Sequence, residues 1–364
     1  MKKFFSLILI FVLVLSSLPG CGQQAAQSDK ITLNIYNWGQ YIADGSYDSL
    51  DVIAAFEEAY PWIDVNYSTF DSNEVMYTKI ANGGITVDLI IPSDYMIARM
   101  IEEDMLLELD YSNIPNYQYI AEEFRGMAYD PEEKYTVPYA WGTVGIIYNT
   151  KYVDEADVTG WELMWNEKYD DKILMFDNSR DAFGIAQLKL GYGLNITDEA
   201  QLEECAKLLE QQKPLVQQYV MDQIFDLMQN EEAWIAACYA GDYVTMAEEN
   251  EDLAFYRPEN SFNLFMDAMC IPKCAQQKEA AELFINFVCN PEIAAANMDW
   301  IAYSTPLDRV VMADYMDAEV LEDPIAYPSM ETIRDAQERE HVYTNLPPAV
   351  SRLMEDLFIK VRIR

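Results

Sequence analysis

The sequence predicts an α/β protein of two domains, and three observations lead to this prediction. Helical and strand-like hydrophobic patterns alternate along most of the chain, which is typical of α/β architecture. Roughly 340 residues follow the N-terminal apolar segment, a length that favours two domains over one. The β-rich run 136–148 is interrupted by Pro138, Gly142 and Gly145. A single strand that passes from one domain into the other would have this pattern, and 263–271 is a second long β-like run.

Residues 1–20 have the features of a lipoprotein signal peptide. Two lysines precede the apolar run 4–15, which is too short to span a bilayer as a helix. Leu-Pro-Gly-Cys at 18–21 resembles a bacterial lipobox, in which Cys21 becomes the lipid-modified N-terminus after cleavage. An ordinary signal peptide with an accidental cysteine is the alternative. Residues 21–29 are polar and suit a tether, so we expect an exported protein anchored to the outer face of the cytoplasmic membrane.

The chain is strongly acidic, with a formal net charge of −38. Nucleic-acid binding requires a basic surface, so this class of partner is disfavoured. Cationic ligands would be attracted by such a field, although solubility alone also explains an acidic surface.

Cysteine and histidine restrict the chemistry further. Five cysteines remain besides Cys21, and an odd number excludes complete internal pairing. We expect buried thiols, with a bridge between Cys270 and Cys274 as the alternative, and no metal or cofactor. His341 is the only histidine and lies in a charged run typical of a surface. Histidine-based catalysis would depend on this residue alone, which disfavours an enzyme.

The first predicted elements follow from short-range patterns. Apolar and polar residues alternate in 31–36, as in a strand with one buried face. Asp71 and Glu74 form a capping-box pattern at the start of a helix. The predicted elements before the crossing run are strands at 31–36, 63–68 and 87–91, and helices at 48–60, 71–81 and 93–105.

The later elements have the same alternation. We expect a strand at 172–176, a turn at 239–242 that opens a helix, and a C-terminal helix from Pro347. The further predicted helices are at 161–165, 182–190, 199–212 and 278–288.

Large aromatic residues follow two of the predicted strands. Trp38 and Tyr41 come just after the first strand, and Tyr95 follows the third. Ligands of open α/β sheets bind beyond the carboxyl ends of strands, so these rings are candidates for a binding site. The alternative is that they only cover the core.

Several stretches, taken in order, resemble the spermidine/putrescine-binding proteins of bacterial ABC importers. They span nearly all of the chain after the tether: 36–41, 67–77, 88–95, 137–142, 177–181, 266–272, 285–287, 303–306 and 331–333. The resemblance implies the two-lobed periplasmic binding protein fold of type II, with two α/β lobes joined by two crossing strands. Lobe one would comprise 30–137 and 268–312, and lobe two 138–267 and 313–364. The ligand would lie between lobes that close over it by a hinge motion.

The resemblance also implies which residues bind. Carboxylates would pair with the ammonium groups of a polyamine, and rings would cover its methylenes. Trp38, Tyr41 and Tyr95 would be ring walls of lobe one, and Asp267 would pair with an ammonium group. Tyr303 would add a ring or a hydroxyl, and Asp181 would be an acid in lobe two. The family commonly has glutamate where this chain has Gln40, and aspartate where it has Asn178. It commonly has tryptophan where this chain has Tyr239 and Phe265.

Asp267 and Asp181 differ in how readily a role other than ligand binding explains them. Asp267 stands inside an apolar run, where an unpaired carboxylate costs free energy, which favours a ligand role. Asp181 and Asp177 straddle a helix start, where aspartate is also a good cap. The family's C-terminal glutamine falls on the stretch 338–340, which would bring Arg339 near the pocket.

The predicted function is therefore that of a lipid-anchored, monomeric receptor that delivers a polyamine to the permease of an ABC importer, without catalysis or a cofactor. The same fold binding another small cationic or polar solute is the first alternative. A secreted hydrolase that uses a pair of carboxylates is the second.

Overall fold

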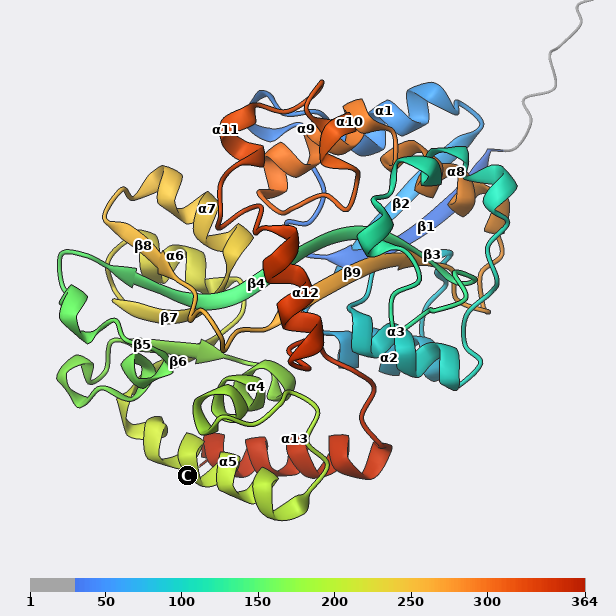
Figure 1. Cartoon of the computed structure of the whole chain (residues 1–364). Helices are drawn as coiled ribbons and strands as arrows, with labels where there is room; N and C mark the ends of the chain where they lie inside the picture. The colour runs from blue at the N-terminus through green and yellow to red at the C-terminus, as the bar shows by residue number, and fades with distance from the viewer. Residues whose placement is uncertain (1–29, 364) are drawn as a thin grey trace, which may run out of the picture.

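The computed structural model describes residues 30–363, which form two α/β lobes joined by a shared sheet (Figure 1). The strand order is β2-β1-β3-β9-β4-β7-β5-β6, and β8 pairs with β4 off this path. The predicted signal peptide, Cys21 and the tether lie outside the described residues.

The first lobe is built on three parallel strands: β1 (Ile31–Trp38), β2 (Ile63–Phe70) and β3 (Leu89–Ile90). The strand β9 (Leu264–Cys270) extends this sheet antiparallel to β3. Its helices are α1 (Val52–Ala59), α2 (Asn73–Ala81), α3 (Asp94–Glu102), α8 (Lys278–Val288) and α9 (Pro291–Ile301).

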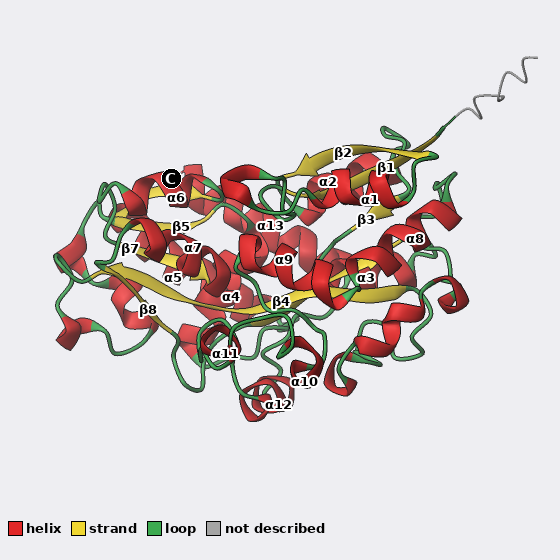
Figure 2. Ribbon diagram, turned by 90° about the horizontal axis from the view of Figure 1, so that it is seen from above, coloured by secondary structure: helices red, strands yellow, loops and turns green. Residues whose placement is uncertain are grey.

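One long strand, β4 (Thr136–Asn149), connects the lobes and runs along most of the molecule's length (Figure 2). Residues 136–143 of β4 pair with β9, and residues 144–148 pair with β7 (Ile235–Tyr239). Thirteen of its fourteen residues are buried, because both ends lie in the middle of a lobe. The prediction of a crossing strand at 136–148 is therefore confirmed, and β9 lies beside it as the second.

The second lobe completes the sheet with β5 (Ile173–Phe176), β6 (Val216–Val220) and β8 (Leu253–Tyr256). Helices cover both faces of its sheet (Figure 1). They are α4 (Ser179–Leu190), α5 (Glu199–Gln212), α6 (Gln223–Gln229), α7 (Ala240–Glu249) and α13 (Pro348–Ile363). Buried apolar side chains form one core cluster in the first lobe and two on opposite faces of the second.

The segment after α9 returns across the first lobe before the chain ends on the second. It contains α10 (Arg309–Met312), α11 (Ala318–Leu321) and α12 (Met330–Glu338). Their buried side chains belong to the core cluster of the first lobe, whereas those of α13 belong to the second. The lobe boundaries expected at 137/138, 267/268 and 312/313 stay predictions. Within residues 30–363, eight short 3₁₀ helices lie at 46–48, 111–113, 115–119, 122–124, 155–157, 161–165, 167–169 and 213–215.

Some local expectations were wrong. The N-cap of α2 is Ser72, whose side chain accepts the N–H of Val75, so Asp71 and Glu74 do not form a capping box. His341 is buried because residues 341–342 lie beside the start of β9, with the carbonyl of His341 accepting the N–H of Leu264.

The prediction of buried thiols has a mixed outcome. Within residues 30–363 all five cysteines are free thiols, and Cys274 is exposed, unlike the buried thiol expected there. None of the described helices is long and apolar enough to cross a membrane. Among the same residues, no group of histidine, cysteine, aspartate or glutamate side chains has the arrangement of a metal site.

Candidate ligand-binding site

A cavity of about 870 Å³ lies between the two lobes. It is lined by the residues that follow β1, β2 and β3 in the first lobe and β5, β6 and β7 in the second, together with β9 itself. All ten residues predicted for the site line it: Trp38, Gln40, Tyr41, Tyr95, Asn178, Asp181, Tyr239, Phe265, Asp267 and Tyr303. Residues from six separate parts of the chain therefore meet in one place.

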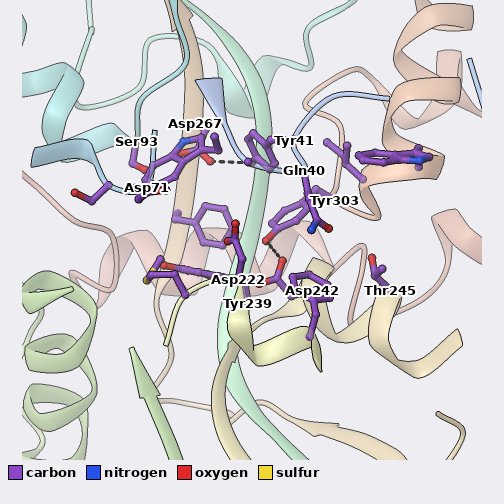
Figure 3. Close-up of a pocket in the computed structure, with 18 of the residues that line it drawn as sticks. Gln40, Tyr41, Asp71, Ser93, Asp222, Tyr239, Asp242, Thr245, Asp267 and Tyr303 are labelled. Carbon is purple, nitrogen blue, oxygen red and sulfur yellow. Dashed lines mark hydrogen bonds between the residues drawn. The ribbon is translucent and has the colours of Figure 1, made fainter. Parts of the chain in front are cut away.

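Asp267 is the buried acid on the first-lobe side. It lies on β9 opposite Ala140 of β4 and is 5% exposed. The hydroxyl of Tyr41 donates a hydrogen bond of 2.7 Å to Oδ2 (Figure 3), while Oδ1 has no hydrogen-bond partner among the described residues. Burial raises the pKa of Asp267 to about 6, and interactions with Ser93 and with the hydroxyl of Tyr41 oppose this rise. One carboxylate oxygen is thus held and the other is available.

Asp181 is the corresponding acid of the second lobe, in the first turn of α4. The N-cap of this helix is Asn178, whose side-chain oxygen accepts the N–H of Asp181 at 2.8 Å. The amide nitrogen of Asn178 donates to Asp181 Oδ2 at 2.7 Å, and the hydroxyl of Tyr239 donates to the same oxygen at 2.6 Å. Tyr343 donates to Oδ1 at 3.1 Å. The capping role considered for Asp181 is filled by Asn178, which leaves Asp181 facing the cavity.

Asp242 is a third acid, which the sequence reasoning did not identify. It follows β7 in the first turn of α7, and its Oδ1 accepts a 2.6 Å hydrogen bond from the hydroxyl of Tyr303 (Figure 3). Burial raises the pKa of Asp242 to about 7, and the hydrogen bond from Tyr303 opposes the rise. Its position in the chain could have identified it, because Asp242 follows the end of a strand, as Tyr95 does.

Rings form a continuous wall from one lobe to the other. Tyr41 contacts Tyr303 edge-on, with ring centroids 5.1 Å apart. Phe265 lies 6.0 Å from Tyr303 and 5.4 Å from Tyr239, both edge-on. Tyr95 of the first lobe meets Tyr343 of the second at 5.9 Å. Such a wall suits methylene groups and cations that pass between the acids.

All of the charged residues in the described lining are acids. None of the lining residues that the structure describes is a lysine, arginine or histidine. The further acids on the cavity, none of them predicted, are Asp48, Asp71, Glu74, Asp222, Asp226, Glu248, Glu249 and Asp299. A cleft with one sign of charge concentrates its field and attracts ligands of the opposite sign.

Some of these acids face each other from opposite lobes. Burial raises the pKa of Glu74, which accepts a hydrogen bond from Tyr95, and the charges of Glu355 and Asp181 across the cleft add to the rise. Burial also raises the pKa of Asp222, and Asp71 of the first lobe contributes. A positively charged guest would relieve this repulsion.

The guanidinium of Arg339, which we expect near the pocket, is absent from the lining of the cavity. Arg339 pairs with Asp335 one helical turn earlier, at 2.9 Å, and does not line the cavity. The prediction that Arg339 would approach the pocket was therefore wrong, because α12 packs against β9 and directs this side chain elsewhere.

Comparisons with known proteins agree with this architecture. The model of the bacterial extracellular solute-binding protein family matches residues 51–327. The spermidine/putrescine-binding periplasmic protein of Salmonella typhimurium is 30% identical over 314 residues, which cover 86% of this chain and 88% of that protein.

Two solved structures have the same fold. The spermidine/putrescine ABC transporter substrate-binding protein of Streptococcus pneumoniae is 37% identical with a TM-score of 0.74, covering 92% of this chain and 99% of the other. A lipoprotein of Treponema pallidum is 28% identical with a TM-score of 0.78, covering 92% of this chain and all of the other. The type II fold with two lobes, which the resemblance implied, is confirmed. The chain belongs to the family of bacterial extracellular solute-binding proteins, which are exported.

Proposed function

We propose that this protein binds a linear polyamine, putrescine or spermidine, between its lobes and delivers it to the permease of an ABC importer. The observation that carries the proposal is the composition of the cavity. Carboxylates of Asp267, Asp181 and Asp242 stand along a wall of touching rings, and within residues 30–363 no basic side chain lines the same space.

Each part of this lining matches one part of a polyamine. A buried ammonium needs charge-assisted hydrogen bonds, and the free Oδ1 of Asp267 provides an acceptor. The rings of Tyr41, Tyr303 and Phe265 provide apolar cover for methylenes and cation–π contacts worth about 0.5–2 kcal/mol each. The ligand-binding role of all ten predicted residues, together with Asp242, is part of this proposal.

The relatives support the choice of ligand class. The proteins of Salmonella typhimurium and Streptococcus pneumoniae carry spermidine/putrescine in their names. The family consists of solute-binding proteins, so we infer a receptor without catalytic activity.

The anchor and the oligomeric state belong to the same proposal. We infer that Cys21 carries the lipid and that 21–29 tether a monomer to the outer face of the cytoplasmic membrane. A structural relative, from Treponema pallidum, is itself named a lipoprotein. Globomycin treatment of cells that express the full chain tests the anchor, because blocking lipoprotein signal cleavage should leave the precursor uncleaved. An unchanged mature mass would exclude lipidation at Cys21.

A screen by calorimetry and thermal unfolding tests the ligand. The mature protein should bind putrescine or spermidine with a 1:1 stoichiometry, and saturation at a hundredfold excess over Kd should stabilise it by about 2.7 kcal/mol. Amino acids and monoamines serve as comparisons. If only another cationic solute binds, the protein is a receptor for that solute and not for a polyamine. Turnover of a glycoside or polymer would contradict the receptor role itself.

A further inference from the structure

The ring of Tyr303 lies in a narrow slot between two glycines. A Cβ placed on Gly142 of β4 would lie 3.7 Å from Cδ1 of Tyr303, which is ordinary contact. A Cβ placed on Gly241 of α7 would lie 2.5 Å from both Cδ2 and Cε2 of the same ring, and 2.8 Å from Cγ. Such distances are too short for real atoms, so the ring rests directly on the backbone of α7.

The backbone itself does not require glycine at position 241. Gly241 has no positive φ and lies in the first turn of a regular helix, where glycine is less favourable than alanine. The three heavy atoms nearest to its missing Cβ all belong to Tyr303. The ring of Tyr303 therefore explains why this position has no side chain.

This contact joins the two lobes across the cavity. Tyr303 follows α9, and its neighbour Ser304 pairs with Trp141 in the first-lobe half of β4. Gly241 belongs to α7 of the second lobe, and the adjacent Asp242 receives the hydroxyl of Tyr303 (Figure 3). The ring is also fixed by Tyr41, edge-on at 5.1 Å, so it is not free to turn away from an added methyl group.

We propose that Gly241 is a positioning residue that sets how far the lobes close over the ligand. The bare backbone of α7 lets the ring of Tyr303 approach, and the hydroxyl of Tyr303 then reaches Asp242. A side chain at position 241 would hold the lobes apart while leaving each lobe intact. This inference rests on the proposed function, because it concerns closure on a bound amine.

Gly241→Ala tests the proposal in the mature chain. In the ligand-free protein, with the cleft open, the methyl group meets no ring and favours the helix, so Tm should rise by about 2 °C. Putrescine and spermidine affinity should fall by about 30-fold, and the decrease in radius of gyration on adding either amine, measured by small-angle X-ray scattering, should be lost.

The same substitution in a variant that lacks the ring of Tyr303 supplies the matched control. Tyr303→Ala removes the group that the methyl would meet, so adding Gly241→Ala to it should change affinity by less than about threefold. An equal loss in both backgrounds would overturn the proposal, as would a Gly241→Ala protein that compacts fully or has a lowered Tm. A wild-type protein that neither binds nor compacts with any amine would instead overturn the proposed function.

Discussion

Tyr41 and Asp267 are 226 positions apart in the chain, and yet the hydroxyl of Tyr41 lies 2.7 Å from the carboxylate of Asp267. Tyr41 follows the strand β1 and is 6% exposed, and its backbone carbonyl accepts the hydroxyl of Tyr139 from β4. The pair is thus fixed by both the central strand and the first-lobe sheet. It leaves Asp267 Oδ1 free, which is the arrangement that a buried ammonium requires.

Asp267→Asn should weaken polyamine binding strongly. The amide keeps the shape but neutralises no charge, and losing one partner of a buried charge pair costs about 2–5 kcal/mol, or at least 30-fold in Kd by calorimetry. Asp177→Asn is the matched control, because Asp177 lies near the same cleft, pairs with Arg362 and does not line the cavity. Equal, small effects of the two changes would contradict the role of Asp267.

Tyr41→Phe should destabilise the ligand-free protein. It removes a hydrogen bond to the buried acid, which costs about 1–3 kcal/mol. The pKa of Asp267 should rise further, because one of the two influences that oppose the rise is lost while that of Ser93 remains. Chemical denaturation measures the first effect and carboxyl NMR the second. A stability within error of wild type, with an unchanged pKa, would show that this hydrogen bond is not formed in solution.

Polyamine binding should weaken as pH falls from about 8 to about 5. The pKa of Asp242 is about 7 and that of Asp267 about 6, so protons compete with the ligand in this window while the amine stays charged. Calorimetry at several pH values should show proton release on binding at pH 6. Constant affinity across the window would contradict the raised pKa values.

The ligand-free protein should depend on pH in the opposite direction. The carboxyl of Asp267, whose hydrogen bond with Tyr41 lies within the first lobe, has a higher pKa in the folded state, about 6, than the ordinary value of 3.8. Between about pH 4 and 6 the folded state therefore binds more protons than the unfolded state, and the contribution of Asp267 to the free energy of unfolding decreases as pH rises through that range. Denaturation of wild type and of Asp267→Asn should show a steeper decline in wild type. Identical pH profiles would rule the assignment out.

Asn178→Asp should change both stability and affinity. Aspartate still caps α4, but the hydrogen bond from Asn178 to Asp181 is replaced by repulsion between two carboxylates. The ligand-free protein should lose about 1 kcal/mol or more, and spermidine binding should tighten because a second charge faces the ammonium. A weaker response to spermidine than in wild type would contradict this view of Asn178.

Short-range patterns predicted much of the fold. The alternation in 31–36, the interrupted run 136–148 and the helix at 278–288 all depend on neighbouring residues, and β1, β4 and α8 lie there. The segment 216–229 was not predicted as β6 and α6, and 161–165 is a 3₁₀ helix. The burial of His341 depends on packing against β9, which no local pattern records.

The site was predictable where a strand end or an apolar run marked it. Trp38, Tyr41, Tyr95 and Asp267 were recognised in this way, and the resemblance supplied the remaining predicted residues. Asp242, Glu74 and Tyr343 line the same cavity but look in the sequence like ordinary acids of a first helical turn or an isolated ring. Their role in the lining follows only from how the two lobes meet.

The most direct test of the central claim is a crystal structure of the mature protein grown with spermidine. We expect one extended ligand between the lobes, with an ammonium nitrogen about 2.8 Å from Oδ1 of Asp267 and the methylenes against Tyr41, Tyr303 and Phe265. A saturated crystal with the amine bound elsewhere, or with an empty cleft, would contradict it.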